Sequence, residues 1–169
     1  MKPAAFNYAK PSSVDEVLGL LFEHDGDAKI LAGGQSLMPT LNMRLSNPSL
    51  LIDINGIDAL DGISVTGDEV RIGALTRHVE VENSADIAKY VPLISLAMPF
   101  IAHPAIRNRG TIGGSVAMAD PAAELPACLC ALDSQIEITG RAGIRNVAAK
   151  EFFKSLYETD AAEDEILTA

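Results

Sequence analysis

AKILAGGQSLMPTLNMRLSNPSLLIDI, residues 28–54, is the stretch that decides the fold of this sequence. It reads as a short buried strand over 28–32, a loop with two adjacent glycines, a short helix, and a second buried strand over 50–54. The capping pattern SVDE at 13–16 predicts an amphipathic helix just before the first strand. Helix, strand, glycine loop, helix and strand in this order predict a small α/β lobe with parallel strands.

The hydrophobic pattern changes after this stretch, and we expect a lobe boundary there. ISVTGDEVRIGALT at 63–76 and QIEITGRAGIRNV at 135–147 each alternate around a glycine-containing turn, which predicts antiparallel hairpins. Helical patterns occupy about 78–100. We therefore expect an α+β fold of two lobes: residues 1–55 with parallel strands, and residues 56–169 with an antiparallel sheet.

Composition narrows the class of protein. Hydrophobic residues make up 48% of the 169 residues, enough for a globular core, and 13 basic against 23 acidic side chains leave a net charge of -10. That charge argues against a nucleic acid or an anionic membrane as a partner. The first residues lack a hydrophobic signal core, and no stretch approaches about 18 consecutive apolar residues, so we expect no membrane insertion and a cytoplasmic location.

The two cysteines, Cys128 and Cys130, stand in the apolar stretch PACLCAL. Neighbours two residues apart do not bridge readily, and the chain offers no further cysteine. We expect buried free thiols in a helix, because a metal site needs more Cys or His ligands nearby. The three histidines are scattered without metal-ligand spacing and are expected on the surface or in loops, so no metal ligand is predicted.

A second glycine pair, Gly113–Gly114, lies between Thr111 and Ser115. Without side chains the backbone approaches a bulky anion closely, and successive N–H groups form an anion-binding concavity. Taken alone, however, a glycine pair more often forms a simple turn. Neither glycine pair belongs to a phosphate-loop motif or to the dinucleotide-binding motif GxGxxG, so the residues alone leave a turn and an anion site open.

Charged residues flank this second loop on both sides. Asp120 followed by Pro121 predicts the N-cap and first residue of a helix. Glu124 then lies one turn into that helix, where its carboxylate can accept hydrogen bonds from sugar hydroxyls. Arg107 and Arg109 precede the loop, and each is a candidate contact for a phosphate or an acidic partner.

Taken together, three motifs carry a family resemblance. LAGGQSLMPTLNMRL at 31–45, RIGALT at 71–76 and IRNRGTIGGSVAMADPAAELPA at 106–127 occur in this order. With them the chain, from residue 6 to 169, resembles the FAD-binding medium subunit of molybdenum hydroxylases, the group that includes aerobic carbon monoxide dehydrogenase and xanthine dehydrogenase relatives. The resemblance implies two α+β lobes that hold FAD between them, of the vanillyl-alcohol oxidase type. The family's C-terminal α/β domain is expected to be absent, and the chain to be part of a longer protein.

The resemblance also implies the residues that contact FAD. The glycine loops supply the pyrophosphate contacts, Glu124 a partner for ribose or ribityl hydroxyls, and two apolar positions elsewhere contact the cofactor. Ser115 stands where many relatives have Asn, and Met118 where close relatives have His. The expected FAD-binding residues are Leu31, Ala32, Gly33, Gly34, Gln35, Ser36, Leu37, Met38, Ile101, Thr111, Ile112, Gly113, Gly114, Ser115, Glu124 and Leu167, with Gly73 and Thr76 as weaker candidates.

In such a subunit the flavin carries the redox chemistry, and no catalytic side chain is expected on the protein. The resemblance implies that electrons pass from a molybdenum site through [2Fe-2S] clusters to FAD and then to an external acceptor. Molybdopterin and the clusters would belong to a large and a small partner subunit. Two alternatives stay open: a stand-alone flavoprotein oxidase or reductase of the same fold, and a non-enzymatic FAD-binding fragment.

Overall fold

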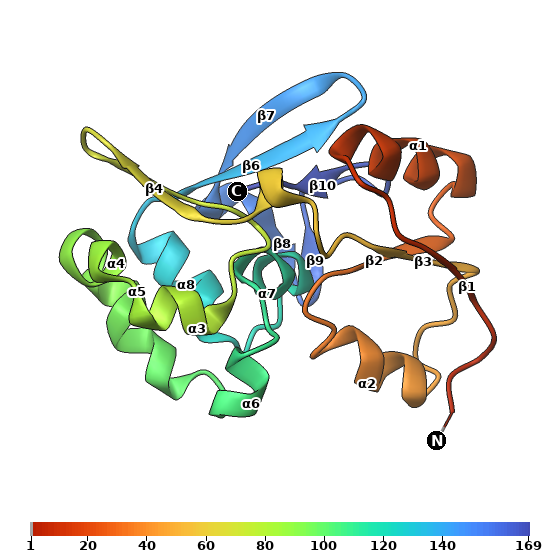
Figure 1. Cartoon of the computed structure of the whole chain (residues 1–169), viewed down its shortest axis with the longest axis horizontal. Helices are drawn as coiled ribbons and strands as arrows, with labels where there is room; N and C mark the ends of the chain where they lie inside the picture. The colour runs from red at the N-terminus through yellow and green to blue at the C-terminus, as the bar shows by residue number, and fades with distance from the viewer. Residues whose placement is uncertain (1) are drawn as a thin grey trace.

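The computed structural model describes residues 2–169 and has a mixed α/β fold with two distinct sides (Figure 1). A parallel sheet with two helices forms one side, and a group of short helices forms the other. Antiparallel strands from the last part of the chain lie between and above them. None of the helices in this described range is both long and apolar enough to cross a membrane.

The parallel sheet has the strand order β1-β3-β2, and all its strand pairs are parallel as predicted. Its elements are β1 (Asn7–Ala9), α1 (Val14–His24), β2 (Ala28–Leu31), α2 (Leu37–Asn42) and β3 (Leu50–Asp53). Helix α1 begins where the capping pattern predicts, since the Ser13 hydroxyl accepts a hydrogen bond of 3.2 Å from the Glu16 N–H. Strand β1 was not predicted.

The antiparallel strands confirm both predicted hairpins. They are β4 (Ile63–Thr66) paired with β5 (Glu69–Ile72), a three-stranded sheet of β6 (Gln135–Gly140), β7 (Gly143–Ala148) and β10 (Ile166–Leu167) in the order β10-β6-β7, and the small pair β8 (Phe153–Ser155) and β9 (Glu158–Thr159). Strand β10 is the short C-terminal strand, and it pairs antiparallel with β6.

The remaining regular elements of the described chain are short helices. They are η1 (Asp58–Leu60), α3 (His78–Asn83), α4 (Ala85–Tyr90), α5 (Pro92–Ala97), η2 (Met98–Phe100), α6 (Pro104–Arg107), α7 (Ile112–Met118), α8 (Glu124–Ala131) and α9 (Ala149–Phe152). The predicted helix start at Asp120–Pro121 is wrong. The Asp120 carboxylate accepts a hydrogen bond of 2.9 Å from the Ala122 N–H and stabilises a turn, so α8 begins only at Glu124.

Two apolar cores lie under these layers. One packs α1 against the parallel sheet and also takes in Leu75 and Ile166 from later segments. The other fills the space between the short helices and the antiparallel sheet, and it includes Cys128. Both cysteines are free thiols on α8, and Cys130 is half-buried, which confirms a helical setting for both. The lobe boundary between residues 55 and 56 stays a prediction.

Candidate functional site

The first glycine loop connects β2 to α2 and packs against the segment that precedes the second loop. Gly34 has a φ of 70°, in the left-handed region that favours glycine. A Cβ on Gly33 would collide with the carbonyl oxygen of Arg109 and would lie 2.8 Å from the Gly110 Cα. Glycine at position 33 therefore lets two backbone segments touch, and the loops lie side by side.

The second glycine loop forms the N-terminus of α7, and its N–H groups are already bonded within the protein. The Ile112 N–H donates to the Thr76 carbonyl at 3.0 Å, and the Gly113 N–H donates to the Ala74 carbonyl at 2.8 Å. The Gly114 N–H donates to the Thr111 hydroxyl at 3.2 Å, which caps the helix. The expectation of an open concavity of N–H groups at this loop is wrong, because residues 74–76 and the Thr111 cap accept from these donors.

The N–H groups of the first loop are different. Among residues 2–169, the backbone N–H groups of residues 33–36 have no hydrogen-bond acceptor. These residues are half-buried or exposed, so a bound anion can reach them. Gly114 is exposed, and a Cβ built on it would lie 3.9 Å from the Ala32 Cβ. Open N–H donors on one loop thus lie next to the exposed Gly114 in the first turn of α7.

The remaining expected FAD contacts fall into a loop group and a core group. Leu31, Leu37 and Met38 are half-buried on either side of the first glycine pair, and Ser115 is half-buried on α7. The apolar positions in the second lobe are buried in one core and offer a ligand only their edges or backbone; they are Ile101, Ile112 and Leu167, at 7–8% exposed.

Glu124 is half-buried at the first position of α8, and the charge of its carboxylate acts to raise the pKa of His78.

The two weaker candidates, Thr76 and Gly73, make contacts that support the fold. Thr76 is buried and exchanges hydrogen bonds of 3.0 Å with the N–H and carbonyl of Gly62. A Cβ on Gly73 would lie 2.5 Å from the Leu60 carbonyl oxygen, so glycine there permits a backbone contact.

Two expectations about charged side chains are wrong. His78 is only 5% exposed, whereas the sequence predicted a surface or loop histidine; its Nε2 lies 3.0 Å from the Thr111 carbonyl, and burial lowers its pKa. Its Nδ1 has no partner within the described range. Arg107 is also buried and donates to Glu82 at 2.8 Å and to the Ile101 carbonyl at 3.0 Å, so it is not free to bind a phosphate.

Asn55 and Arg77 belong to the site and were not expected from the sequence. The Asn55 amide donates to the Ala32 carbonyl at 2.9 Å, in the first loop. The Arg77 guanidinium donates to the Asn55 side-chain oxygen at 2.5 Å and to the Arg109 carbonyl. The signal that could have found Asn55 is its position directly after a buried strand, at the edge of the sheet where the first loop also begins.

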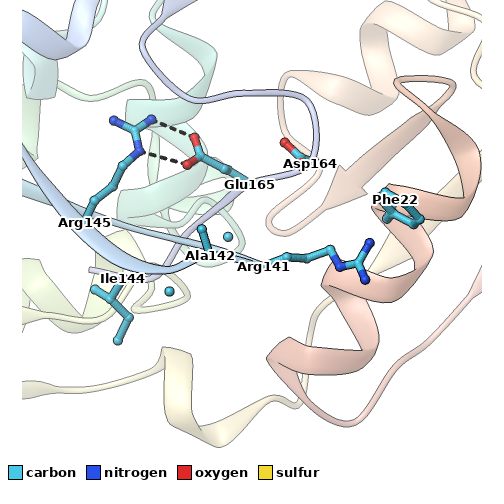
Figure 2. Close-up of a pocket in the computed structure, with 9 residues that line it drawn as sticks. Phe22, Arg141, Ala142, Ile144, Arg145, Asp164 and Glu165 are labelled. Atoms are coloured by element: carbon cyan, nitrogen blue, oxygen red, sulfur yellow. Dashed lines mark hydrogen bonds and ion pairs between the residues drawn. The ribbon is translucent and has the colours of Figure 1, made fainter.

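A crevice of about 560 Å³ lies elsewhere, between α1 and the turn of the β6–β7 hairpin (Figure 2). The Arg141 guanidinium stacks on the Phe22 ring, with its Cζ 3.9 Å from the ring centroid. Arg145 forms an ion pair of 2.6 Å with Glu165. None of the residues that line the crevice belongs to either glycine loop. Arg145 and Glu165 are paired with each other and Arg141 stacks on Phe22, so the loop pair remains the candidate site.

Comparisons with known proteins agree with a flavin-binding fold. A family model described as the FAD binding domain in molybdopterin dehydrogenase matches residues 4–169. The chain is 47% identical over 167 residues to the 6-hydroxypseudooxynicotine dehydrogenase complex subunit alpha of Paenarthrobacter nicotinovorans, covering 99% of this chain and 56% of that protein. It is 41% identical to the carbon monoxide dehydrogenase medium chain of Hydrogenophaga pseudoflava, covering 99% and 58%.

Solved structures give the same result. Carbon monoxide dehydrogenase from Hydrogenophaga pseudoflava, in a form lacking the Mo-pyranopterin moiety of the molybdenum cofactor, superimposes with a TM-score of 0.98 at 41% identity, over 99% of this chain and 58% of that chain. Quinoline 2-oxidoreductase from Pseudomonas putida 86 superimposes with a TM-score of 0.96 at 41% identity, over 99% of this chain and 59% of that chain. The chain therefore spans somewhat more than half the length of the relatives it matches.

Proposed function

Because the chain belongs to the family of FAD binding domains in molybdopterin dehydrogenases, we propose that it binds FAD between its two glycine loops and carries electrons for a molybdenum hydroxylase. The observation that supports this site is the row of open N–H groups at residues 33–36 beside the exposed Gly114. A pyrophosphate is doubly charged and the chain has a net charge of -10, so local N–H dipoles must supply the attraction.

In this proposal each loop has its own role. The first loop donates its backbone N–H groups to the pyrophosphate, and the half-buried side chains of Leu31, Leu37 and Met38 exclude water from it. The second loop offers the half-buried hydroxyl of Ser115, while the buried Thr111 hydroxyl caps α7 and the glycines permit close packing.

The buried residues at 101, 112 and 167 form the apolar floor for the flavin, and the Glu124 carboxylate accepts hydrogen bonds from sugar hydroxyls. When bound, FAD supplies the redox chemistry, and the chain binds and orients it. The proposal includes a two-lobed arrangement of the vanillyl-alcohol oxidase type, with lobes at residues 1–55 and 56–169.

The proposal extends to the assembly. Relatives carry names such as carbon monoxide dehydrogenase medium chain and caffeine dehydrogenase subunit beta, which are subunits of larger enzymes. We place this chain with a large molybdenum-cofactor subunit and a small [2Fe-2S] subunit, so that electrons arrive from the clusters and leave through FAD to an external acceptor. A cytoplasmic location belongs to the same proposal, and the two free thiols are compatible with it.

The experiment is to purify the protein, record its visible spectrum, and titrate it with FAD. We expect flavin absorbance and quenched flavin fluorescence for the unmodified chain. Gly34→Val strains a left-handed position, and Gly114→Val places a Cβ 2.7 Å from the Thr111 hydroxyl, so both should lose FAD binding while far-UV circular dichroism is retained. Gly19→Ala, whose Cβ meets no atom within 4 Å, is the control. Unchanged binding in both valine variants would refute the site.

A further inference from the structure

A chain of polar contacts joins the two glycine loops beneath the candidate site. It starts at Tyr8 on β1, whose hydroxyl donates to the Asp53 carboxylate at 2.5 Å. The other Asp53 oxygen accepts from the backbone N–H of Asn55 at 2.9 Å and from its side-chain amide at 2.6 Å. Burial raises the pKa of Asp53, but the hydrogen bonds from Tyr8 and Asn55 outweigh it and lower that pKa, so the acceptor stays ionised.

Asn55 connects this carboxylate to the first loop and to the second lobe. Its amide donates to the Ala32 carbonyl at 2.9 Å, directly before the glycine pair. Its side-chain oxygen accepts from Arg77 Nη2 at 2.5 Å. Both the amide nitrogen and the side-chain oxygen of Asn55 are thus engaged, by the sheet, the loop and one arginine.

Arg77 is fixed to the second loop by its backbone. Residues 76–78 lie antiparallel to residues 110–112, with a bridge between Arg77 and Thr111 and a hydrogen bond of 2.9 Å from the His78 N–H to the Gly110 carbonyl. The Arg77 N–H donates to the Glu80 carboxylate at 2.7 Å, which anchors the start of α3. Its Nη1 donates to the Arg109 carbonyl, the same oxygen against which Gly33 packs.

From these contacts we propose that Asn55 and Arg77 are positioning residues that set the separation of the two glycine loops, and thereby the affinity for the pyrophosphate of a dinucleotide. The inference rests on the proposed function. Both η nitrogens of Arg77 are engaged by protein oxygens, so its charge acts through the loops rather than on the ligand. Without these hydrogen bonds the two loops keep their glycines, but the polar contacts through Asn55 and Arg77 no longer fix the distance between them.

The test compares FAD binding in Arg77→Met with binding in Arg71→Met. Arg71 is the control, because it also forms a charge-assisted contact between separate segments, 2.7 Å to Glu137, and neither residue belongs to a glycine loop. We expect Arg77→Met to weaken FAD binding by about tenfold or more, and Arg71→Met to change it by less than about twofold. Binding is read from flavin fluorescence, and unfolding of the FAD-free chain is measured in parallel.

A second pair of variants keeps the inference falsifiable if Arg77→Met does not fold. Arg77→Lys retains the charge and can reach one of the two acceptors, so its FAD affinity should lie between that of the wild type and that of Asn55→Leu, which severs both connections. The visible circular dichroism of bound FAD, measured at saturating FAD, should also change in these variants and not in Arg71→Met. A merely structural role of Arg77 and Asn55 would not change this signal.

The outcomes separate this inference from the proposed function. If the Arg77 and Asn55 variants bind FAD as the wild type does, while Gly34→Val and Gly114→Val do not, the positioning role is wrong and the site stands. If the glycine variants also bind normally, the site itself is wrong. If Arg71→Met weakens binding as much as Arg77→Met, the loss reflects general destabilisation, and the positioning role is overturned.

Discussion

At the scale of single residues, Gly113 and Gly19 are both helical glycines with opposite surroundings. A Cβ on Gly113 would lie 2.5 Å from the Ala74 Cβ and 2.8 Å from the Ala74 carbonyl oxygen, whereas one on Gly19 meets nothing within 4 Å. Gly113→Ala should therefore lower the free energy of unfolding by about 1–3 kcal/mol through overpacking. Gly19→Ala, in the exposed face of α1, should raise it by about 0.5–1 kcal/mol. Urea unfolding measures both, and equal effects would contradict the packing argument.

His78 makes a second prediction at this scale, for pH. Burial lowers its pKa from the ordinary value of 6.5; Arg107 lowers it further, while the Thr111 carbonyl and Glu124 act in the opposite direction. The unfolded chain therefore binds this proton more readily than the folded chain does. The stability that neutral His78 contributes is complete above pH 6.5 and is lost as the pH falls toward the folded pKa.

His78→Gln keeps an N–H donor for the Thr111 carbonyl but does not titrate. The difference in unfolding free energy between about pH 7.5 and pH 5.5 should therefore be smaller in this variant than in the wild type. Denaturant unfolding at both pH values checks this. His103→Gln, at an exposed position, should keep the wild-type difference; a wild-type pH dependence in His78→Gln would show that another group is responsible.

At the scale of elements, the start of α1 depends on one side chain. The Ser13 hydroxyl accepts the Glu16 N–H at 3.2 Å, and Asp15 and Glu16 place negative charge in the first turn. Ser13→Ala should lower the free energy of unfolding by about 0.5–2 kcal/mol. Ser12→Ala is the neighbouring control, because the Ser12 hydroxyl makes only an exposed contact of 3.1 Å with the Glu16 carboxylate. Thermal or urea unfolding measures both variants. A larger loss of stability in Ser12→Ala than in Ser13→Ala would contradict the assignment of Ser13 as the cap.

The elements that the sequence predicted are those with local signals. The hairpins of β4–β5 and β6–β7 turn at glycines with alternating flanks, and α1 has its cap and apolar spacing within eleven residues. Strand β1 has no such signal: it is three residues long, two of them exposed, and only its pairing with β3 makes it a strand. The turn at Asp120 could not be distinguished from a helix cap, because the same side chain stabilises both.

The candidate site also has features that the sequence predicts and features that it does not. Both glycine pairs could be found from the sequence, because close backbone approach demands glycine. The state of their N–H groups could not, since it depends on residues 74–76 packing against residues 111–113. The burial of Arg107 depends on Glu82, and the contact of Arg77 with Asn55 joins residues 22 positions apart. Such partners are chosen by the tertiary fold.

At the scale of the whole molecule, the C-terminal strand connects both cores. Ile166 is 2% exposed and packs with the parallel sheet, while its neighbour Leu167 is 8% exposed and packs in the other core. Successive residues of a strand point to opposite faces, so β10 places one side chain in each core. Leu75 likewise reaches from the second predicted lobe into the core of the first. The two lobes should therefore unfold as one cooperative unit.

Ile166→Ala tests this cooperativity. Removing the side chain leaves a cavity beside the parallel sheet, and the free energy of unfolding should fall by about 2–5 kcal/mol. If the lobes unfold together, amide hydrogen exchange should accelerate by the same factor in β3, which lies next to the cavity, and in β6, which belongs to the other core. Ile144→Ala, at a position 67% exposed on β7, should change stability by less than about 0.5 kcal/mol. Faster exchange confined to β3 would mean that the parallel-sheet lobe opens alone, and the shared strand would then be a contact between two separately stable units.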